Sequence, residues 1–368
     1  MAVYKIFPTQ DATMYSLYPS MNTGIDEIIE STTTAFGAFD PDPQVSRFLI
    51  QFDTTTITDI INNKISGSNW TAYLRCYAAN VTGLSEATTV YIYPVSQSWN
   101  NGTGKYLDQP ITTNGVSWTW ADYSGSTPWQ TGNFNPGTTA SYSTTVGGGV
   151  WYTSPSASQL FEYSNPIDIE TDVKNIVSAW YSSSIPNNGF IVKQASNEEF
   201  IDNLDVQVEM KFFSIDTNTI YPPQLEFRWN DHRFNTGSAT NTIINTALLT
   251  CTLAENPGVF FLDSVNRFRI NCRPTYPPRV YQTASIYTTN YYLPQNSYWA
   301  IKDLDTNDVI VDFDNTYTKI SADSQSSYFD VYMNGLEPER YYKILLKTTV
   351  GGSTIILDDN YYFKIANK

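Results

Sequence analysis

The chain has 368 residues, of which 41% are hydrophobic and only 15% are charged, and its net charge is −15. Such a chain can bury substantial cores, so its composition excludes wholesale disorder. The negative charge and the lack of a Lys/Arg cluster exclude nucleic acid as a partner. Low charge combined with many Thr, Asn, Ser and Tyr residues predicts an all-β protein. The length is sufficient for two domains.

Three cysteines at wide spacing fit neither an even disulfide framework nor a metal cluster: Cys76, Cys251 and Cys272. We expect three buried or half-buried thiols in a reducing compartment, and no cofactor. The N-terminus lacks the apolar region of a secretion signal. No apolar run approaches 18 residues, so no membrane segment is predicted. Together these features predict synthesis in a cytoplasm.

Strands are predicted where apolar and polar residues alternate or where β-branched and aromatic residues cluster. In the first part of the chain these runs cover residues 1–7, 47–52, 73–78, 88–94, 190–193, 206–213 and 222–229. Within the run at 47–52, Phe48, Ile50 and Phe52 share one face. This spacing of strands predicts a β-sandwich.

Two segments have helical spacing instead. Four isoleucines predict a short helix or helical turn: Ile57, Ile60, Ile61 and Ile65. A second set predicts one clear helix: Val173, Ile176, Val177 and Trp180. We expect Thr171 to be the N-cap of this second helix, because a threonine hydroxyl can accept a hydrogen bond from the first turn.

A long loop is predicted from about Ser98 to Gly149. Its residues are mostly Gly, Asn, Thr, Ser and Pro, and it holds four of the nine tryptophans. Such loops join strands at one end of a sandwich, where indole rings pin polar backbone. Most tryptophans should therefore be core or loop-pinning residues. The candidates for binding in this loop are Trp118, Trp120 and Trp129.

A second group of strands predicts a small sandwich, with runs at 299–302, 309–311, 328–332, 341–349 and 361–365. A proline cluster at 274–278 marks a stiff linker. We therefore assign one domain to 1–230, a connecting β segment of open membership to 231–273, and a second domain to 274–368. Four tyrosines in a polar stretch are candidates for a contact surface: Tyr287, Tyr291, Tyr292 and Tyr298.

Residues suited to catalysis are scarce. His232 is the only histidine, and we interpret it as a surface or interface residue rather than a catalytic base. Adjacent carboxylates at 26–27, 198–199 and 358–359 are interpreted as solvated, because neighbours on a strand point to opposite faces. We predict that the protein is not an enzyme. We also expect its carboxylates to ionise well below pH 6, leaving no group that titrates near neutrality.

The segment 303–308 has carboxylate or amide oxygens at alternate positions, as calcium-binding loops do. It lacks the glycine at the sixth position and the glutamate at the twelfth position of such loops. It also lies between two strand-like runs. We therefore prefer an Asp/Asn-rich hairpin turn to a calcium site here, and we predict no metal.

Across residues 1–230 the order of motifs resembles the DNRLRE-type β-sandwich family, whose jelly-roll-like domains occur in bacterial surface proteins, secreted carbohydrate-associated proteins and phage structural proteins. The matching motifs are Asp11-Ala-Thr, Asn22-Thr-Gly24, Arg47 before the phenylalanine strand, Trp99 with Gly102-Thr-Gly104, Gly115-Val-Ser-Trp118, Pro128-Trp-Gln-Thr-Gly132, the helix at 172–180 with Pro186-Asn-Asn-Gly-Phe190, and Lys211-Phe-Phe-Ser214 with Pro223-Gln-Leu225.

The C-terminal part resembles a fibronectin-III or Ig-like module. Gly335-Leu-Glu-Pro338 followed by Tyr341 looks like a tyrosine corner, in which the phenol bonds to nearby backbone. The two resemblances imply an all-β chain: a jelly-roll-like β-sandwich with one short helix, then a smaller Ig/FnIII-like β-sandwich.

A protein that joins these two modules looks most like a component of a tailed-phage virion. The resemblance implies a non-enzymatic structural protein (a head decoration, a collar or neck protein, or a fibre) that is made in the host cytoplasm and located in the virion. Its partners would be other virion proteins, with homo-oligomeric or repeated copies. The alternative is a carbohydrate-binding module or adhesin that binds a glycan through the loop at 98–149. Neither hypothesis involves nucleic acid or a membrane.

Overall fold

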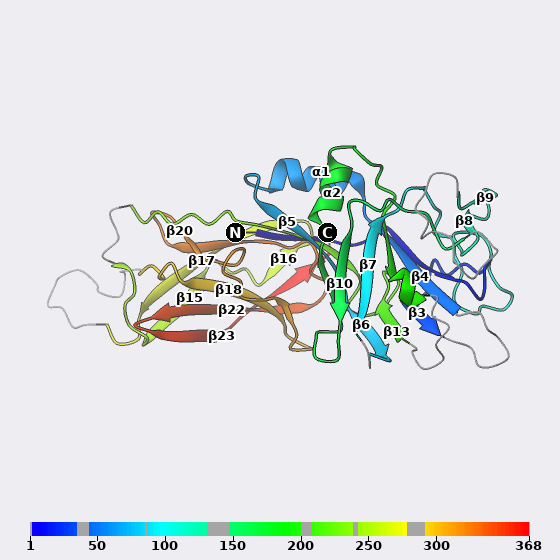
Figure 1. Cartoon of the computed structure of the whole chain (residues 1–368). Helices are drawn as coiled ribbons and strands as arrows, with labels where there is room; N and C mark the ends of the chain where they lie inside the picture. The colour runs from blue at the N-terminus through cyan, green and yellow to red at the C-terminus, as the bar shows by residue number, and fades with distance from the viewer. Residues whose placement is uncertain are drawn as a thin grey trace. The chain divides into compact units, whose positions relative to one another are not determined.

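A computed structural model describes residues 2–34, 44–84, 87–130, 147–199, 208–237, 242–277 and 291–367. The chain is all β apart from a few short helices (Figure 1), which confirms the predicted fold class. None of the helices in these ranges has the length and hydrophobicity of a membrane-spanning segment.

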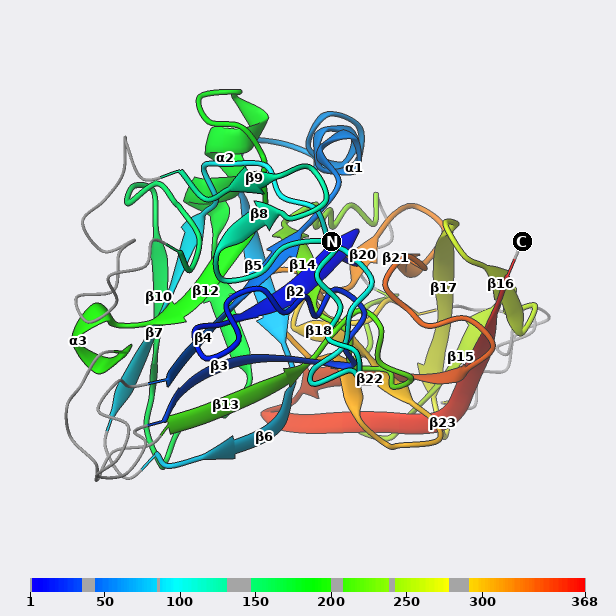
Figure 2. The ribbon, with the colours of Figure 1, turned by 90° about the vertical axis from the view of Figure 1, so that its right-hand side faces the viewer.

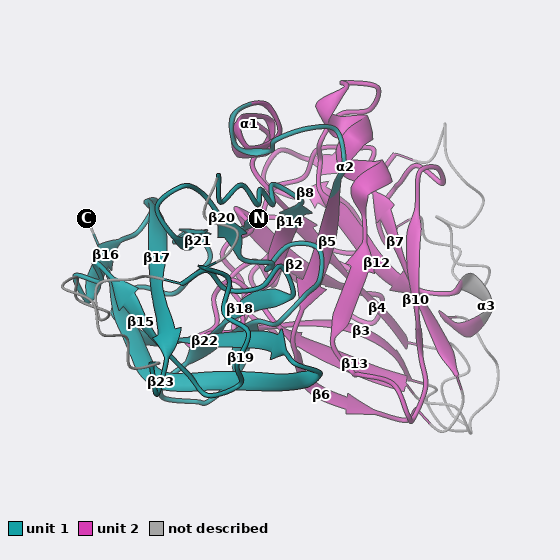
Figure 3. Ribbon diagram, turned by 90° about the vertical axis from the view of Figure 1, so that its left-hand side faces the viewer, with its two compact units in different colours: residues 1–5, 63–70, 227–368 teal, residues 6–62, 71–226 magenta. Residues whose placement is uncertain are grey.

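The chain forms two compact units, each discontinuous in sequence (Figure 3). Unit 1 consists of residues 1–5, 63–70 and 227–368, and unit 2 of residues 6–62 and 71–226. The predicted boundary at 230 lies near the end of unit 2. The segment 231–273, whose membership was open, belongs to unit 1. Residues 1–5 and 63–70 also belong to unit 1, although the sequence places them in the first domain.

Unit 2 is built on a large sheet with strand order β10-β7-β12-β4-β3-β13-β6, to which β2 adds by pairing with β4. The bounds of these strands are β2 Gln10–Tyr15, β3 Ile28–Thr34, β4 Gln44–Gln51, β6 Ala78–Thr82, β7 Thr88–Pro94, β10 Ala157–Phe161, β12 Phe190–Gln194 and β13 Val208–Phe213. Figure 2 shows β4, β3, β13 and β6 side by side.

Four more strands form a second sheet with the order β1-β14-β5-β11. Their bounds are β1 Ala2–Ile6, β5 Trp70–Cys76, β11 Ile169–Asp172 and β14 Gln224–Trp229. The division between the units falls inside β1, β5 and β14. A small ribbon pairs β8 Trp120–Asp122 with β9 Thr127–Pro128.

Strand β4 is buried on both faces. Phe48 and Ile50 point to one side, as predicted, and the Phe48 ring lies 5.8 Å from that of Phe212 on β13. Leu49 and Val45 point to the other side and join a separate hydrophobic cluster. Burial of both faces explains why the run at 47–52 is apolar almost throughout. It also leaves Arg47 fully buried.

Both predicted helical segments are helices. The first comprises α1 Thr54–Asp59 and a π-helical turn η1 Ile60–Lys64, and the second is α2 Lys174–Tyr181; α3 Ser196–Glu199 was not predicted. The predicted N-cap was wrong. Thr171 lies in β11 and its hydroxyl donates to Gln159 Oε1, whereas Val173 occupies the N-cap position of α2. Thr171 is paired with β5 as part of strand β11, so it lies before the start of the helix.

Unit 1 is an Ig-like sandwich of two sheets, with strand orders β15-β17-β21-β20 and β16-β23-β22-β18-β19. The bounds of these strands are β15 Leu249–Ala254, β16 Val259–Phe261, β17 Val265–Pro274, β18 Ser297–Asp303, β19 Val309–Val311, β20 Ser321–Ala322, β21 Ser327–Tyr332, β22 Tyr341–Val350 and β23 Ser353–Ala366. The first strands divide between the sheets as in Ig domains, since β15 pairs with β17 whereas β16 runs parallel to β23. Pro274, predicted as linker, ends strand β17.

An aromatic stack fills the core of unit 1. The Trp299 ring stacks on Phe329 at 5.2 Å, and Phe329 stacks on Phe268 at 5.4 Å. Cys251 and Cys272 lie opposite each other on β15 and β17 beside this core, and all three cysteines of the chain are buried thiols, as predicted.

The tyrosine corner of unit 1 is formed by Tyr342, not by the predicted Tyr341. The Tyr342 hydroxyl donates to the backbone oxygen of Glu337 at 3.0 Å. Only 2% of Tyr342 is exposed, compared with 45% of Tyr341. Neighbouring residues on a strand point to opposite faces. A prediction that is wrong by one residue therefore selects the exposed Tyr341 in place of the buried Tyr342.

We predict that Tyr342→Phe lowers the free energy of unfolding by about 1 kcal/mol, because it deletes one buried hydrogen bond and leaves the Glu337 carbonyl without its donor. Denaturant unfolding of the full chain would measure the change. The matched control is Tyr341→Phe, which should leave stability unchanged. Equal effects of the two substitutions would contradict this assignment of the corner.

Candidate functional site

The tryptophans proposed for binding are mostly core residues. Only 2% of Trp118 and 2% of Trp129 is exposed, and both join the hydrophobic cluster on the Leu49 side of β4. The Trp129 indole nitrogen donates to the Ser117 backbone oxygen at 2.9 Å. The ring faces of Trp118 and Trp129 are therefore not available to a ligand, whereas Trp120 is half-buried beside Tyr123.

The proposed tyrosines of unit 1 are also less exposed than the sequence indicates. Tyr292 is buried, so it is not a contact residue. Tyr291 and Tyr298 are half-buried, and the Lys347 ammonium lies 5.3 Å from the Tyr298 ring. Tyr287 lies outside the described residues. Among the described candidates, Trp120, Tyr291 and Tyr298 are therefore the ones that keep a partly exposed ring.

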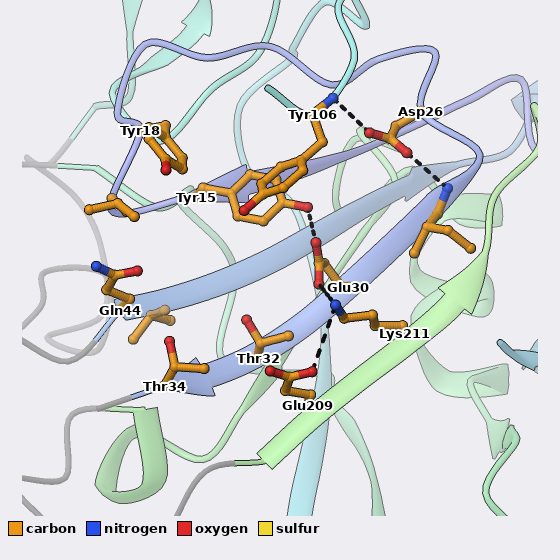
Figure 4. Close-up of a pocket in the computed structure, with 13 residues that line it drawn as sticks. Tyr15, Tyr18, Asp26, Glu30, Thr32, Thr34, Gln44, Tyr106, Glu209 and Lys211 are labelled. Atoms are coloured by element: carbon orange, nitrogen blue, oxygen red, sulfur yellow. Dashed lines mark hydrogen bonds and ion pairs between the residues drawn. The ribbon is translucent and has the colours of Figure 1, made fainter. Parts of the chain in front are cut away.

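A pocket of about 660 Å³ lies in unit 2 instead. Its floor is the outer face of β3, β13 and the start of β4 (Figure 4). On β3 the even-numbered side chains Ile28, Glu30, Thr32 and Thr34 line it, because alternate residues of a strand share a face. The odd-numbered residues of β3 are buried in the opposite direction. The pocket is thus built on a rigid sheet.

Charged residues on β13 lie directly across from polar residues on β3. Lys211 is the register partner of Glu30, and Glu209 is the partner of Thr32. The Lys211 ammonium lies 3.5 Å from Glu30 and 3.7 Å from Glu209 (Figure 4). Burial would lower the pKa of Lys211, but the two carboxylates outweigh it and raise that pKa. Lys211 is therefore a permanent cation between two acids.

Three tyrosine rings form one wall of the pocket: Tyr15 from β2, Tyr18 from the loop after it, and Tyr106 from the tryptophan-rich loop. The Tyr106 ring lies 4.8 Å from that of Tyr15 and 6.2 Å from that of Tyr18. Tyr15 donates to Glu30, whereas 44% of Tyr106 is exposed. The wall thus presents one accessible aromatic face above a floor of carboxylates and hydroxyls.

Asp26 fixes the position of Tyr106. One carboxylate oxygen accepts from the backbone nitrogen of Tyr106 at 2.7 Å, and the other accepts from that of Ile28 at 3.2 Å. Both bonds are drawn in Figure 4. Asp26, interpreted from sequence as part of a solvated pair, therefore ties the tryptophan-rich loop to the start of β3.

Asn22 completes this arrangement. Its buried amide donates to the Asn101 and Val116 backbone oxygens at 2.6 and 2.8 Å, and its oxygen accepts from the Gly104 nitrogen at 2.7 Å. A side chain at Gly104 would place its Cβ 2.3 Å from the Asn22 backbone oxygen. The motifs at 22–24 and 102–104 are therefore two halves of one backbone contact, which presents Tyr106 to the pocket.

The other sequence motifs do not form a site. Asp303 is fully buried and its carboxylate accepts two 2.8 Å bonds from Arg340, so the segment 303–308 is the hairpin turn between β18 and β19. His232 is half-buried, and burial and Lys319 lower its pKa to about 4. In the described ranges, no group of three His, Cys, Asp or Glu residues could hold a metal ion.

One feature of the sequence does indicate the pocket. In β3 the side chains at 28, 30, 32 and 34 form a face that becomes polar toward the end of the strand, opposite the alternating acid and base of β13. The tyrosines could not be found in this way, because they come from segments about 90 residues apart. Contacts between the segment 21–27 and the loop around Tyr106, including those of Asn22 and Asp26, bring Tyr106 beside Tyr15.

The chain matches no protein-family profile and no curated protein. Among solved structures, it is similar to a DUF4785 family protein from Legionella pneumophila, with 9% sequence identity and a TM-score of 0.19. The alignment covers 98% of this chain and 66% of that one, so this chain spans just under two thirds of its length. A likeness at this level carries no argument about function.

Proposed function

We propose that the protein is a non-enzymatic binding protein that holds a saccharide in the tyrosine pocket of unit 2. The observation that carries this proposal is the accessible Tyr106 ring beside hydroxyl, amide and carboxylate groups in a pocket of about 660 Å³. A sugar ring offers an apolar C–H face for such a ring and hydroxyls for the polar groups. The volume falls within the range of ~300–1,000 Å³ usual for small-molecule sites.

The arrangement of the carboxylates favours binding over hydrolysis. A glycosidase needs one protonated and one ionised carboxyl group that face each other across the bond to be broken. Here the Lys211 ammonium lies between Glu30 and Glu209, so these two carboxylates do not face each other across an open gap. Tyr15 also donates to Glu30. We therefore expect bound oligosaccharides to be recovered intact after prolonged incubation.

We further propose that this binding protein is a tailed-phage virion component present in repeated copies. The support is the order of motifs across residues 1–230 and the Ig-like module that follows. Light scattering on the purified chain should show an oligomer, and density maps of the source particle should show the chain at a symmetric position. A monodisperse monomer with no affinity for any virion protein would contradict this placement.

The test of the saccharide site is Tyr106→Ala. We predict that this substitution weakens oligosaccharide binding about tenfold, because an aromatic contact contributes roughly 0.5–1.5 kcal/mol beyond its buried area. Isothermal titration calorimetry would measure the change. Tyr163→Ala is the matched control, since 94% of Tyr163 is exposed and it does not line the pocket. Equal binding by both variants would rule out the pocket as the site.

A further inference from the structure

The charges that line the pocket are unequal. Among the described residues that line it, three are carboxylates, from Asp26, Glu30 and Glu209, and one is a cation, Lys211, so the formal charge of this lining is −2. No arginine is among the lining residues. The whole chain carries a net charge of −15, so more distant groups add to the negative potential.

These three carboxylates differ in what remains available to a ligand. Both oxygens of Asp26 accept backbone hydrogen bonds. Glu30 accepts from Tyr15, is held by Lys211 and is largely buried. Glu209 is more accessible than Glu30, with 35% of its side chain exposed compared with 11%, and Lys211 lies 3.7 Å from its carboxylate. Glu209 can therefore take a further donor.

An anionic sugar would find no suitable partner for its charge among the described residues of this pocket. A uronic, sialic or sulfated residue needs a cation or several N–H donors at its charged group, because removal of that group from water is costly. The single candidate, Lys211, is already held between Glu30 and Glu209. The floor would therefore repel an anionic ligand.

We propose that the pocket selects saccharides that carry a free amino group, with Glu209 as the residue that receives the ammonium. This inference rests on the saccharide site proposed above and adds its charge selectivity. The ammonium would donate to the Glu209 carboxylate while the sugar ring lies against Tyr106. Glu209 is thus a specificity-determining residue, and Tyr106 serves saccharides of any charge.

The test is calorimetry of the full-length protein with three trisaccharides: glucosamine with free amino groups, N-acetylglucosamine, and galacturonic acid. The glucosamine trimer should bind about tenfold more tightly than the neutral trimer, which is the increment expected of one charge-assisted hydrogen bond. The galacturonic acid trimer should bind most weakly. Added salt should reduce the differences.

Two substitutions separate local recognition from general attraction to an acidic protein. Glu209→Gln should abolish the preference for the glucosamine trimer over the N-acetylglucosamine trimer. Glu170→Gln changes the net charge equally but does not line the pocket, so it should keep the preference. Glu209→Lys should shift the preference toward the galacturonic acid trimer.

The outcomes distinguish the two proposals. If none of the three trimers binds to the wild-type protein, the saccharide site itself is wrong. If the neutral trimer binds in a way that depends on Tyr106, but the glucosamine trimer binds no better or Glu170→Gln removes the preference as well, the saccharide site stands and the charge selectivity is wrong.

Discussion

Glu199→Gln should lower the free energy of unfolding by about 3–5 kcal/mol, the usual cost of leaving a buried charge without its partner. Glu199 is fully buried and forms ion pairs with both Arg47 and Lys193. Glu199→Gln would remove the negative charge that these two buried cations share. Denaturant unfolding followed by tryptophan fluorescence would measure the change.

The geometry of this cluster explains the size of the effect. Arg47 donates to both carboxylate oxygens of Glu199, at 2.9 and 2.8 Å, and to the Gly148 backbone oxygen at 2.7 Å. The guanidinium carbon lies 5.0 Å from the Trp118 ring and 5.3 Å from the Trp151 ring. Strand β4, helix α3 and the end of the tryptophan-rich loop are therefore joined by one side chain.

Lys193 adds a pH dependence to this prediction. Its ammonium lies 2.8 Å from Glu199, and burial lowers its pKa. Without Glu199 that pKa should fall further, so Lys193 can lose its proton as the pH rises. The destabilisation by Glu199→Gln should therefore be smaller at pH 9 than at pH 6.

The matched control is Glu170→Gln in the same unit. Glu170 is 44% exposed and lies 3.7 Å from Arg75, so its ion pair is expected to contribute about 1 kcal/mol or less. If Glu199→Gln were as mild as this control, the buried cluster would not stabilise the fold. The sequence interpretation of residues 198–199 as a solvated pair is wrong for Glu199, because α3 turns that carboxylate toward Arg47.

Asp11→Asn should stabilise the protein relative to wild type, and the gain should be clearly larger at pH 8 than at pH 5. Burial, together with the nearby Asp216 and Asp26, raises the pKa of Asp11 to about 8, although Asp11 accepts from the Ile215 nitrogen at 2.8 Å. The side chain is therefore protonated in the folded protein near neutrality. Thermal unfolding of both proteins at the two pH values would measure the difference.

The sign follows from proton binding. An unfolded aspartate has a pKa of about 3.9, so between about pH 4 and pH 8 the folded protein holds one proton that the unfolded chain does not. Stability from this group is complete below about pH 4 and is lost as the pH rises through 8, by at most ~1.4 kcal/mol per pH unit. Asparagine keeps the shape and an acceptor oxygen, and it removes this loss.

Asp53→Asn provides the control. Asp53 is exposed and caps α1 through the Thr56 nitrogen at 2.7 Å, and its hydrogen bonds to Thr56 lower its pKa. Its contribution to stability is therefore lost only as the pH falls below the usual aspartate range. The difference between Asp53→Asn and wild type should be equal at pH 5 and pH 8. A pH-independent difference for Asp11→Asn as well would contradict the raised pKa.

Asp11 also corrects an expectation from the sequence. Composition indicates carboxylates that ionise well below pH 6, because an average carboxylate lies in water. Asp11 lies in a strand in which polar and apolar residues alternate, as they do in many strands. The neighbouring sequence therefore does not indicate that Asp11 is buried. Burial is the main cause of the raised pKa of Asp11, and the carboxylate of Asp216, about 200 positions away in sequence, raises it further, whereas the hydrogen bond from the Ile215 nitrogen lowers it.

Periodicity in the sequence determined the fold class, the two main helical segments and most of the strands, because a strand or helix with one buried face repeats its apolar residues at a fixed interval. The buried cysteines and the hairpin at 303–308 followed from spacing in the same way. Even where the pattern was correct, the face could be off by one residue, as Tyr341 and Tyr342 show.

Only the tertiary structure decided which polar residues are buried and which aromatic rings are free. Arg47, Glu199 and Asp11 look like surface residues until distant segments cover them. Trp118 and Trp129 look like binding residues until the loop folds onto β4. The pocket itself combines rings and charges from strands and loops up to about 200 residues apart. Contacts of this kind depend on chain topology, which local periodicity does not encode.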